Sequence, residues 1–569
     1  MANPKRIVIV GGVAGGASAA ARARRLSESA EITLFERGPY VSFANCGLPY
    51  HVAGIIPDRK KLLVQTPESL MARFNLDVRV NTEVVAIDPA ARAVTVRELK
   101  TGRERQVPYD ELVLSPGAEP VRPPIPGVGH PRVLSLRNMG DMDAILEAMA
   151  DARRALVVGA GYIGLEMAEA FRHRGLDVTL VERLDQVMSV ADPDMVGPLH
   201  DELRAKGVDL RLGRSVERFE AAGAGLEAHL SDGTSVACDL AVMAIGVRPE
   251  VTLARQAGLA LGPTGGILVD EHMRTSVPGI WAVGDAVEVR DAVLDGPALI
   301  PLAGPANRQG RIAADNIFGR PSVYKGTQGT AVCKVFDLAF AMTGQTEKGL
   351  KRLGVPFRKI YVHPADHATY YPGAHPISLK LLFEPGEGHI LGAQAVGAAG
   401  ADKRIDVIAT AMRGGLTVFD LEDAELCYAP PFGSAKDPVN MAGFVASNVL
   451  RGDVELWEPE ELAALSGDQV LVDVRTLTEY RKGTIPGADL APVDELRDRL
   501  DDLDRAKEYL VFCQVGLRGY VACRLLTQLG FRARNLSGGY KRWQMWKGTA
   551  RDLAQEAACG EDGATACGA

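Results

Sequence analysis

Two cysteines stand in stretches of sequence that could give a thiol a chemical role. Cys46 lies in VSFANCGLPY (41–50), and the next cysteine along the chain is Cys238, so no local disulfide is available. A lone thiol of this kind can form a mixed disulfide with a small thiol or oxidise to sulfenic acid. Cys513 opens the stretch CQVGLR, in which Arg518 follows at the expected start of a helix. Backbone amides and the helix dipole there would stabilise a thiolate or a persulfide anion.

The residues before Cys46 predict a strand, a glycine-rich turn, a helix and a second strand. RIVIVGG (6–12) is a β-branched run ending in glycine, ASAAARARRL (17–26) is typical of a helix, and EITLFER (31–37) indicates the next strand. Such a unit places a pyrophosphate on a helix N-terminus, and an acid at the end of its second strand binds a ribose. The candidate nucleotide-binding residues here are Gly11, Gly12, Gly16, Glu36 and Arg37.

The same pattern returns at 155–183. Gly159, Gly161 and Gly164 match the dinucleotide fingerprint in full, and Glu182 ends the following strand. A carboxylate there hydrogen-bonds a free 2′-hydroxyl and repels a 2′-phosphate, which favours NADH. Arg183 follows directly and keeps NADPH as the alternative.

A third element, TSVPGIWAVGDAVE (275–288), is a strand that ends in Gly284 and Asp285. Three such motifs in this order resemble the pyridine nucleotide-disulfide oxidoreductases over about residues 5–450. The resemblance implies that the first fold binds FAD, that the second binds the nicotinamide nucleotide, and that Asp285 contacts the flavin ribityl chain.

SFANCGLPY is similar to the single-cysteine branch of that family, which contains coenzyme A-disulfide reductases, NADH oxidases and peroxidases, and NADH-dependent persulfide reductases. The resemblance implies catalysis by Cys46 and a coenzyme A site formed by Arg22, Arg25, Ser42, Asn45, Asn307, Arg308 and Arg311. Arg24 lies on the same helix as Arg22 and Arg25. The alternative to coenzyme A binding is that these arginines only form a solvent-exposed helix face.

Two further stretches, HATYYPGAHP (367–376) and CYAPPFGSAKDPVN (427–440), are similar to segments that carry a tyrosine across the dimer in coenzyme A-disulfide reductases. Tyr370, or its neighbour Tyr371, and Tyr428 match those tyrosines, whose phenols can donate to a departing thiolate. The alternative to proton donation is that these tyrosines only pack at a subunit interface. The resemblance implies a homodimer in which both subunits contribute residues to each active site.

The C-terminal part resembles a rhodanese domain over about 455–549. The matching stretches are Asp473-Val474-Arg475, residues 483–488, the CQVGLR loop and LSGGYKRW (536–543). Thr484 stands where that family usually has histidine. Because only four residues separate Cys513 from Arg518, the loop suits sulfur rather than phosphate.

The remaining cysteines have no surrounding constellation. Cys523 is expected in the core, no role is assigned to Cys238, Cys333 or Cys427, and Cys559 and Cys567 lie in a small polar tail. No metal site is predicted.

Together these patterns predict an α/β protein with two Rossmann-like dinucleotide-binding domains, an α+β dimerisation domain and a C-terminal α/β rhodanese domain. The expected boundaries are 1–115 and 256–325 for the FAD-binding domain, 116–255 for the NAD(P)H-binding domain, 326–452 for dimerisation, 455–549 for the rhodanese domain and 550–569 for a disordered tail.

Composition narrows the partners and the compartment. With 64 Lys and Arg against 72 Asp and Glu, the net charge of −8 disfavours nucleic acid and a polybasic membrane role. No apolar run approaches the roughly 18 residues of a membrane span. Eight scattered cysteines favour a reducing cytoplasm.

The sequence therefore predicts a flavoenzyme that uses NAD(P)H to reduce persulfides, polysulfides and coenzyme A disulfides through Cys46, while Cys513 handles sulfane sulfur. FAD, NADH and coenzyme A are the expected cofactors. Two alternatives remain: an NADH oxidase or peroxidase that cycles through Cys46 sulfenic acid, and a redox-sensing flavoprotein that binds a partner.

Overall fold

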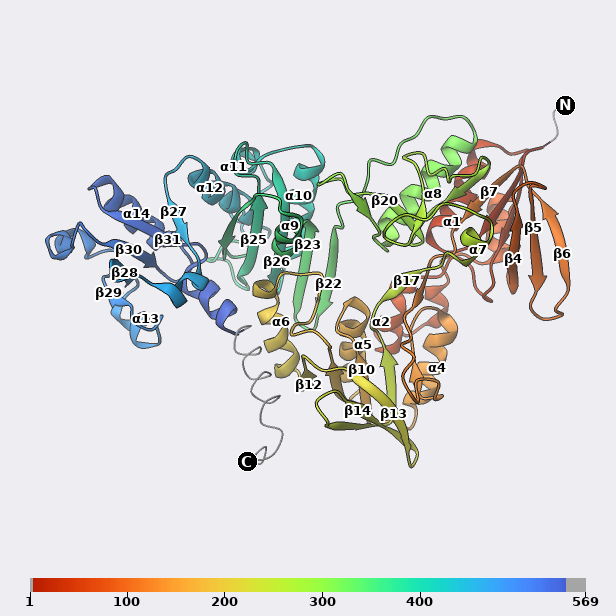
Figure 1. Ribbon diagram of the computed structural model, residues 1–569, viewed down its shortest axis with the longest axis horizontal. Coiled ribbons are helices and arrows are strands. Elements are labelled where there is room, and N and C mark those ends of the chain that lie inside the picture. The colour runs from red at the N-terminus through yellow and green to blue at the C-terminus, as the bar shows by residue number, and fades with distance from the viewer. Residues whose placement is uncertain (1–3, 549–569) are drawn as a thin grey trace. The chain divides into compact units, whose positions relative to one another are not determined.

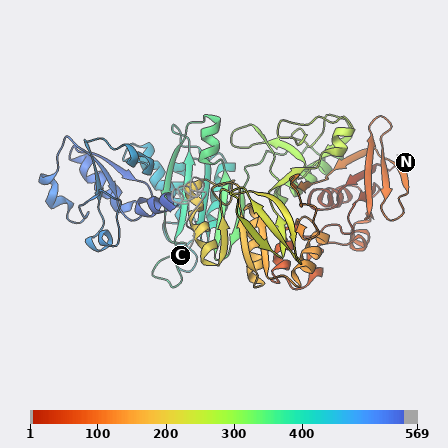
Figure 2. The same ribbon diagram turned by 60° about the horizontal axis from the view of Figure 1, so that its bottom comes forward.

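The computed structural model describes residues 4–548, and Figures 1 and 2 show its helices and strands. The chain divides into two compact units. The first runs to Val181 and resumes over Ser215–Gly329, whereas the second contains Glu182–Arg214 and the residues from Thr330 onward. The predicted tail at 550–569, with Cys559 and Cys567, lies outside the described residues.

The first parallel sheet is built around β1 (Arg6–Val10), which is buried from its second residue onward. A strand buried on both faces needs an unbroken apolar run, which RIVIV supplies. In the order β19-β7-β1-β2-β3 its neighbours are β2 (Glu31–Phe35), β3 (Asp77–Arg79), β7 (Glu111–Leu114) and β19 (Ile280–Ala282). The sheet thus joins two stretches of chain that are far apart in sequence. Helices α1 (Ala14–Leu26) and α8 (Ala303–Ile317) pack against each other beside it (Figure 1).

The second parallel sheet repeats this plan. It contains β9 (Val133–Leu134), β10 (Arg154–Val158), β11 (Asp177–Val181) and β16 (Leu240–Met243), with β10 between β11 and β16. Helix α5 (Tyr162–His173) follows β10 and packs on the sheet. Helix α2 (Leu48–Val52) contacts both α5 and α4 (Met139–Met149), so the stretch after Cys46 lies against the second nucleotide fold.

Smaller elements complete the first unit. The antiparallel ones are β4 (Thr82–Asp88), β5 (Ala93–Glu98) and β6 (Glu104–Pro108); β13 (Val216–Ala222), β14 (Gly225–Leu230) and β15 (Ser235–Cys238); and the pair β8 (Ala118–Pro120) and β17 (Val247–Pro249). A three-stranded sheet contains β18 (Ile267–Leu268), β20 (Val287–Arg290) and β21 (Pro297–Ala298), in which β20 pairs parallel with β18 and antiparallel with β21. The remaining helices are α3 (Pro67–Phe74) and α7 (Thr252–Gln256).

The second unit contains an antiparallel sheet in the order β22-β23-β26-β25-β24, whose central strands are buried on both faces. Its strands are β22 (Ala331–Val335), β23 (Leu338–Gly344), β24 (Arg358–Val362), β25 (Ile377–Phe383) and β26 (Ile390–Gly397). Helices α10 (Ala401–Arg413) and α12 (Pro438–Leu450) pack on the sheet, and α6 (Pro193–Ala205) contacts β26 and β22. The remaining elements are β12 (Val208–Arg211), α9 (Glu347–Leu353) and α11 (Val418–Asp423).

The last sheet is parallel, in the order β27-β31-β30-β28-β29. It contains β27 (Glu455–Trp457), β28 (Gln469–Asp473), β29 (Asp489–Leu490), β30 (Glu508–Phe512) and β31 (Arg532–Leu536). Helices α13 (Leu477–Arg481) and α14 (Leu517–Gln528) follow β28 and β30. Cys513 is therefore at the carboxyl end of a central strand, where ligands bind in open α/β sheets.

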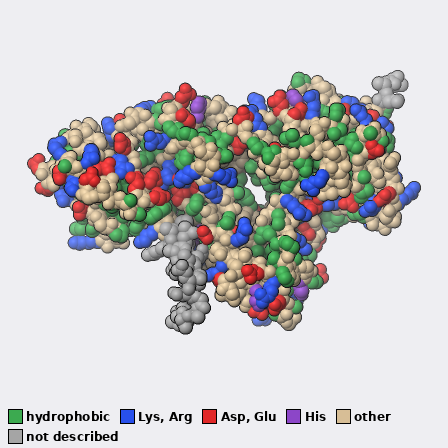
Figure 3. Space-filling model, viewed as in Figure 1, with side chains coloured by type: hydrophobic (Ala, Val, Ile, Leu, Met, Phe, Trp, Pro, Cys, Tyr) green, Lys and Arg blue, Asp and Glu red, His purple; other side chains and the backbone are tan. Residues whose placement is uncertain are grey.

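The architecture confirms the predicted fold class of two Rossmann-like folds, an α+β domain and a C-terminal α/β domain. Among the described residues, no helix combines the length and apolar character needed to cross a bilayer. On the face shown in Figure 3, acidic and basic side chains are interspersed.

Candidate active sites

The first glycine turn connects β1 to α1 with little room for side chains. Gly11 has a φ of 90°, and a Cβ at Gly16 would lie 1.9 Å from the carbonyl oxygen of Gly11. Helix α1 begins without a side-chain cap, which leaves its first amides available to a phosphate. The turn fits a pyrophosphate that rests on the helix N-terminus.

Two carboxylates, Glu36 and Asp285, follow strands of the first parallel sheet. Glu36 accepts hydrogen bonds from the amides of Gly12 (2.9 Å) and Gly38 (2.8 Å), which hold the acid next to the glycines. Asp285 follows β19, and burial raises its pKa. The residues present therefore fit FAD. Arg37 is placed differently, since its guanidinium pairs with Glu119 at 3.2 Å.

The second glycine turn has the same geometry. Gly159 has a φ of 99°, and a Cβ at Gly164 would lie 1.9 Å from its carbonyl oxygen. Gly161 caps α5 without a side-chain hydrogen bond and has open space where a Cβ would project. Glu182 follows β11 directly and accepts a hydrogen bond from Leu184 N at 2.9 Å. These features fit a second dinucleotide.

Cys46 lies in a short 3₁₀ turn, Asn45–Gly47, that leads straight into α2. The loop before it is bound to the first glycine turn, because Ser42 N donates to Gly12 O at 2.7 Å. Asn45 donates to the carbonyl oxygen of Arg137 at 3.2 Å. These contacts place the thiol beside the flavin fold.

The Cys46 side chain is exposed, and every cysteine in the described range is a free thiol. Neighbouring protein atoms still displace part of the water around the thiol, which raises the pKa of Cys46, and the charges of Glu166 and Asp285 raise it further. The thiol is thus close to one acid from each nucleotide fold.

Glu166 and Tyr50 belong to this site but were not predicted from the sequence. Glu166 is on α5, and its carboxylate accepts a hydrogen bond from the Tyr50 hydroxyl at 3.2 Å. Burial raises the pKa of Glu166 to about 7, so its charge changes near neutral pH. Both residues stand within quoted motifs, two positions after Gly164 and at the end of VSFANCGLPY, but only the tertiary structure brings them together.

The charge of Glu166 gives a testable pH dependence. Glu166→Gln removes a negative charge that raises the Cys46 pKa, so the variant's thiolate should form at lower pH. We expect the pH profile of iodoacetamide alkylation at Cys46 to shift down by about 1 pH unit, the low end of what a neighbouring charge causes. The exposed Glu31→Gln on β2 is the control. An unchanged profile, or a shift to higher pH, would contradict this placement of Glu166.

The two predicted tyrosine segments meet in the second unit. The hydroxyl oxygens of Tyr370 and Tyr428 lie 2.6 Å apart, although the side chains are 74% and 47% exposed. The hydrogen bond raises the pKa of Tyr370. Tyr371 instead packs edge-on against His367, so Tyr370 is the residue that pairs with Tyr428.

The arginines predicted for coenzyme A separate into buried and exposed groups. Arg22, which was predicted to bind coenzyme A, is buried against Asp315, with its Nε 2.7 Å from the carboxylate, so its charge is already paired. Arg24 is also buried and donates to backbone carbonyls. The exposed residues are Arg25, Asn307, Arg308 and Arg311, on the packed helices α1 and α8.

The Cys513 loop directs a backbone amide at the sulfur of the cysteine. Cys513 is buried at the end of β30, and Gly516 N donates to its Sγ at 3.2 Å. Helix α14 begins at Leu517. Arg518 donates to both carboxylate oxygens of Glu479, at 2.8 and 2.6 Å, and this pairing lowers the pKa of Glu479 to about 2.

Hydrogen bonds connect the Cys513 loop to the neighbouring strand end. Arg475 donates to Asp473 and also to Gln514 Oε1 at 3.0 Å. Thr484, the departure from the usual histidine, donates to Asp473 at 2.7 Å. Cys523 is in the core as expected, and burial raises its pKa strongly.

The remaining described cysteines are of two kinds. Cys238 and Cys333 are buried, whereas Cys427 is exposed beside Tyr428. Burial raises the pKa of Cys238 to about 12, which disfavours thiolate chemistry there.

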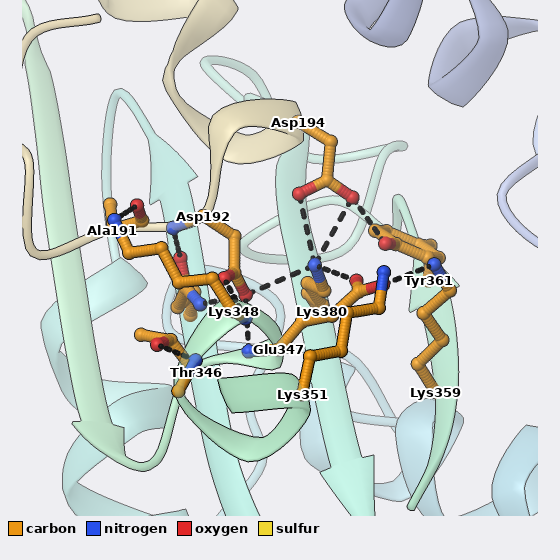
Figure 4. Close-up of polar contacts among 12 residues, drawn as sticks. Ala191, Asp192, Asp194, Thr346, Glu347, Lys348, Lys351, Lys359, Tyr361 and Lys380 are labelled. Carbon is orange, nitrogen blue, oxygen red and sulfur yellow. Dashed lines mark hydrogen bonds and ion pairs between the residues drawn. The ribbon is translucent and has the colours of Figure 1, made fainter. Parts of the chain in front are cut away.

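Three carboxylates converge in the second unit, with oxygens from Asp192, Asp194 and Glu347 within 4.8 Å of one another (Figure 4). The ammonium of Lys380 lies among them, 3.0, 2.9 and 2.7 Å from the three acids, and is 1% exposed. The Tyr361 hydroxyl also donates to Asp194. A lysine thus supplies the positive charge at this cluster, whose members come from distant stretches that no motif connects.

Comparison with known proteins decides the family. Residues 5–310 match the description Pyridine nucleotide-disulphide oxidoreductase, residues 330–438 match its dimerisation domain, and residues 458–545 match a Rhodanese-like domain. A coenzyme A disulfide reductase of Staphylococcus aureus (strain JH9) is 37% identical over 444 residues, which cover 78% of this chain and 99% of that protein.

The chain belongs to the pyridine nucleotide-disulphide oxidoreductase family. Two solved structures of this family also contain the C-terminal part. Reduced Bacillus anthracis CoADR-RHD has a TM-score of 0.93 and 48% identity, covering 95% of this chain and 98% of that one. A NAD-dependent persulfide reductase from A. fulgidus has a TM-score of 0.88 and 37% identity, covering 95% and 100%. The predicted family, its enzyme class and its use of FAD with NAD(P)H are confirmed.

Proposed function

We propose that this flavoenzyme uses NADH to reduce persulfides, polysulfides and coenzyme A disulfides at Cys46, and that Cys513 handles sulfane sulfur. The observation that carries the proposal is the exposed Cys46 thiol between Glu166 and Asp285, with no cysteine partner in the same loop. Relatives named coenzyme A disulfide reductase and persulfide reductase support the same substrate class.

The chemistry begins with attack of the Cys46 thiolate on one sulfur of the disulfide. The S–S bond breaks, and the departing thiolate takes a proton from the Tyr370 or Tyr428 hydroxyl, which regains one from water. A mixed disulfide between Cys46 and the other half of the substrate remains. Two electrons and one proton then release the second thiol and restore the Cys46 thiolate.

A persulfide substrate reacts in the same two stages, with the same numbers of electrons and protons. Cys46 attacks the outer sulfur, the carrier leaves as a thiol, and two electrons with one proton release hydrogen sulfide. The first glycine turn, Glu36 and Asp285 would hold FAD, which would supply the two electrons taken from NADH. Glu182 would favour NADH, because its carboxylate repels a 2′-phosphate.

For coenzyme A, we propose a surface of Arg25, Asn307, Arg308 and Arg311 together with Ser42 and Asn45. Guanidinium groups suit phosphates because their fork of donors binds two oxygens at once. Arg22 is left out because Asp315 neutralises it.

The exposed tyrosine pair supports a proposal about the oligomeric state of the enzyme. Residues 330–438 match a dimerisation domain, and Tyr370 and Tyr428 are strongly exposed. We propose a homodimer in which the pair on one subunit reaches Cys46 of the other, in the cytoplasm where thiols stay reduced.

The decisive experiment measures NADH consumption with coenzyme A disulfide, coenzyme A persulfide, polysulfide, peroxide and oxygen, with sulfide release measured alongside. We expect turnover with the sulfur acceptors, sulfide from those that contain sulfane sulfur, and lower kcat/KM with NADPH. Turnover confined to oxygen or peroxide would instead identify an oxidase or peroxidase. Negligible turnover with every acceptor would favour the redox sensor.

A further inference from the structure

The tyrosine pair depends on two loops that have little regular structure of their own. Tyr370 lies between β24 and β25, and Tyr428 lies between α11 and α12. Both side chains are strongly exposed, so packing around the rings does not hold the 2.6 Å contact between their hydroxyls. Something beneath the loops must fix their relative position.

Arg404 on α10 lies beneath both loops and is 2% exposed. Its Nη2 donates to the carbonyl oxygen of Asp366 at 2.6 Å, in the loop that carries Tyr370. Its Nη2 and Nε donate to the carboxylate of Asp437 at 2.8 and 3.2 Å, after the loop that carries Tyr428. One planar guanidinium therefore ties the two segments together.

Further contacts carry this restraint toward the tyrosines. Ala368 N donates to Gly433 O at 2.9 Å, which joins the loops directly. The Asp366 carboxylate accepts from His375 N at 2.7 Å and lies 3.0 Å from His367 Nδ1, so it closes the first loop on itself. Asp437 also caps α12 through Val439 N, which fixes the end of the second segment.

We propose that Arg404 is a positioning residue that sets the Tyr370–Tyr428 hydroxyl pair for proton donation. This inference rests on the proposed function, which gives the tyrosines their role. Arginine is required because its rigid fork donates to a carbonyl and a carboxylate at the same time, whereas lysine offers a single ammonium on a flexible stem.

The test compares Arg404→Lys, Tyr428→Phe and the double variant in the full-length, FAD-loaded enzyme. We expect Arg404→Lys to lower kcat for coenzyme A disulfide by about 10-fold with little change in KM, because part of a general-acid contribution is lost. The double variant should be no slower than Tyr428→Phe alone, since both changes remove the same function. Arg413→Lys, an exposed arginine on the same helix, is the matched control.

Sulfur transfer from thiosulfate to cyanide at Cys513 reports on folding of the same unit and should not change. If Arg404→Lys yields little folded protein, Asp437→Asn gives the same comparison, because it keeps one acceptor oxygen. The positioning role would be overturned if the two fold-losses in kcat multiplied in the double variant, or if kcat were unchanged in Arg404→Lys. An unchanged kcat in a protein that carries both Tyr370→Phe and Tyr428→Phe would instead refute the proposed role of the tyrosines, and this inference with it.

Discussion

Cys46→Ser should reduce NADH-dependent turnover of every disulfide and persulfide acceptor to background, a loss of about 10⁴-fold or more, as expected when a nucleophile is removed. Serine does not attack sulfur at neutral pH and forms no bond to sulfur that electrons could cleave. The measurement is steady-state NADH oxidation with each acceptor. Sulfur transfer from thiosulfate to cyanide should be retained, because Cys513 has its own cradle in a separate sheet.

The reciprocal variant completes this comparison. Cys513→Ser should abolish sulfur transfer and leave coenzyme A disulfide reduction largely intact. The control is Cys523→Ser, which removes a buried thiol from the same domain and tests for a nonspecific effect of that loss. Loss of coenzyme A disulfide reduction in a folded, FAD-loaded Cys513→Ser protein would show that the two thiols do not form separate centres.

Lys380→Met should destabilise the protein by about 3–5 kcal/mol at neutral pH, the usual cost of leaving buried charges without their partner. Lys380 is the ammonium shared by Asp192, Asp194 and Glu347, and it is 1% exposed. The measurement is the denaturant midpoint of the second unit, followed by the Cys513 sulfur-transfer activity. Lys351→Met is the control, because Lys351 pairs with the same Glu347 but is 65% exposed, where ion pairs contribute about 1 kcal/mol or less.

The loss of stability in Lys380→Met, called the deficit below, should depend on pH because the carboxylates around Lys380 titrate. Burial opposes their ionisation, but in the native protein Lys380, together with the other cations around the cluster, outweighs it and lowers the pKa of Asp194 and Glu347. Their stabilising contribution is present above the ordinary carboxylate pKa of about 4 and is lost as the pH falls through the lowered values. Removing Lys380 takes away the largest attraction that opposes burial, so these pKa values should rise and the deficit of the variant should shrink as the pH falls from 7 toward 4. A deficit that is constant over this range would contradict the role of Lys380.

The sequence alone was sufficient for the features whose chemistry is local. Gly16 and Gly164 each specify a strand-turn-helix within a few residues, because the carbonyl oxygen that excludes a side chain at each of them belongs to the same turn. Cys513 and its neighbouring glycine likewise lie within one loop. The order of these units, with the dimerisation and rhodanese patterns, was enough for the fold class and the family.

The tertiary structure decided which distant side chains meet. Tyr370 rather than Tyr371 pairs with Tyr428, Glu166 joins Tyr50 beside Cys46, and Asp315 removes Arg22 from the exposed cations. Lys380 and Arg404 each satisfy groups from separate elements. These pairings depend on how helices and sheets pack, and packing depends on the shape of whole surfaces rather than on residue spacing along the chain. A motif was therefore enough to propose Cys46 and Cys513 as the reacting thiols, whereas only the packed fold shows which distant groups contact one another.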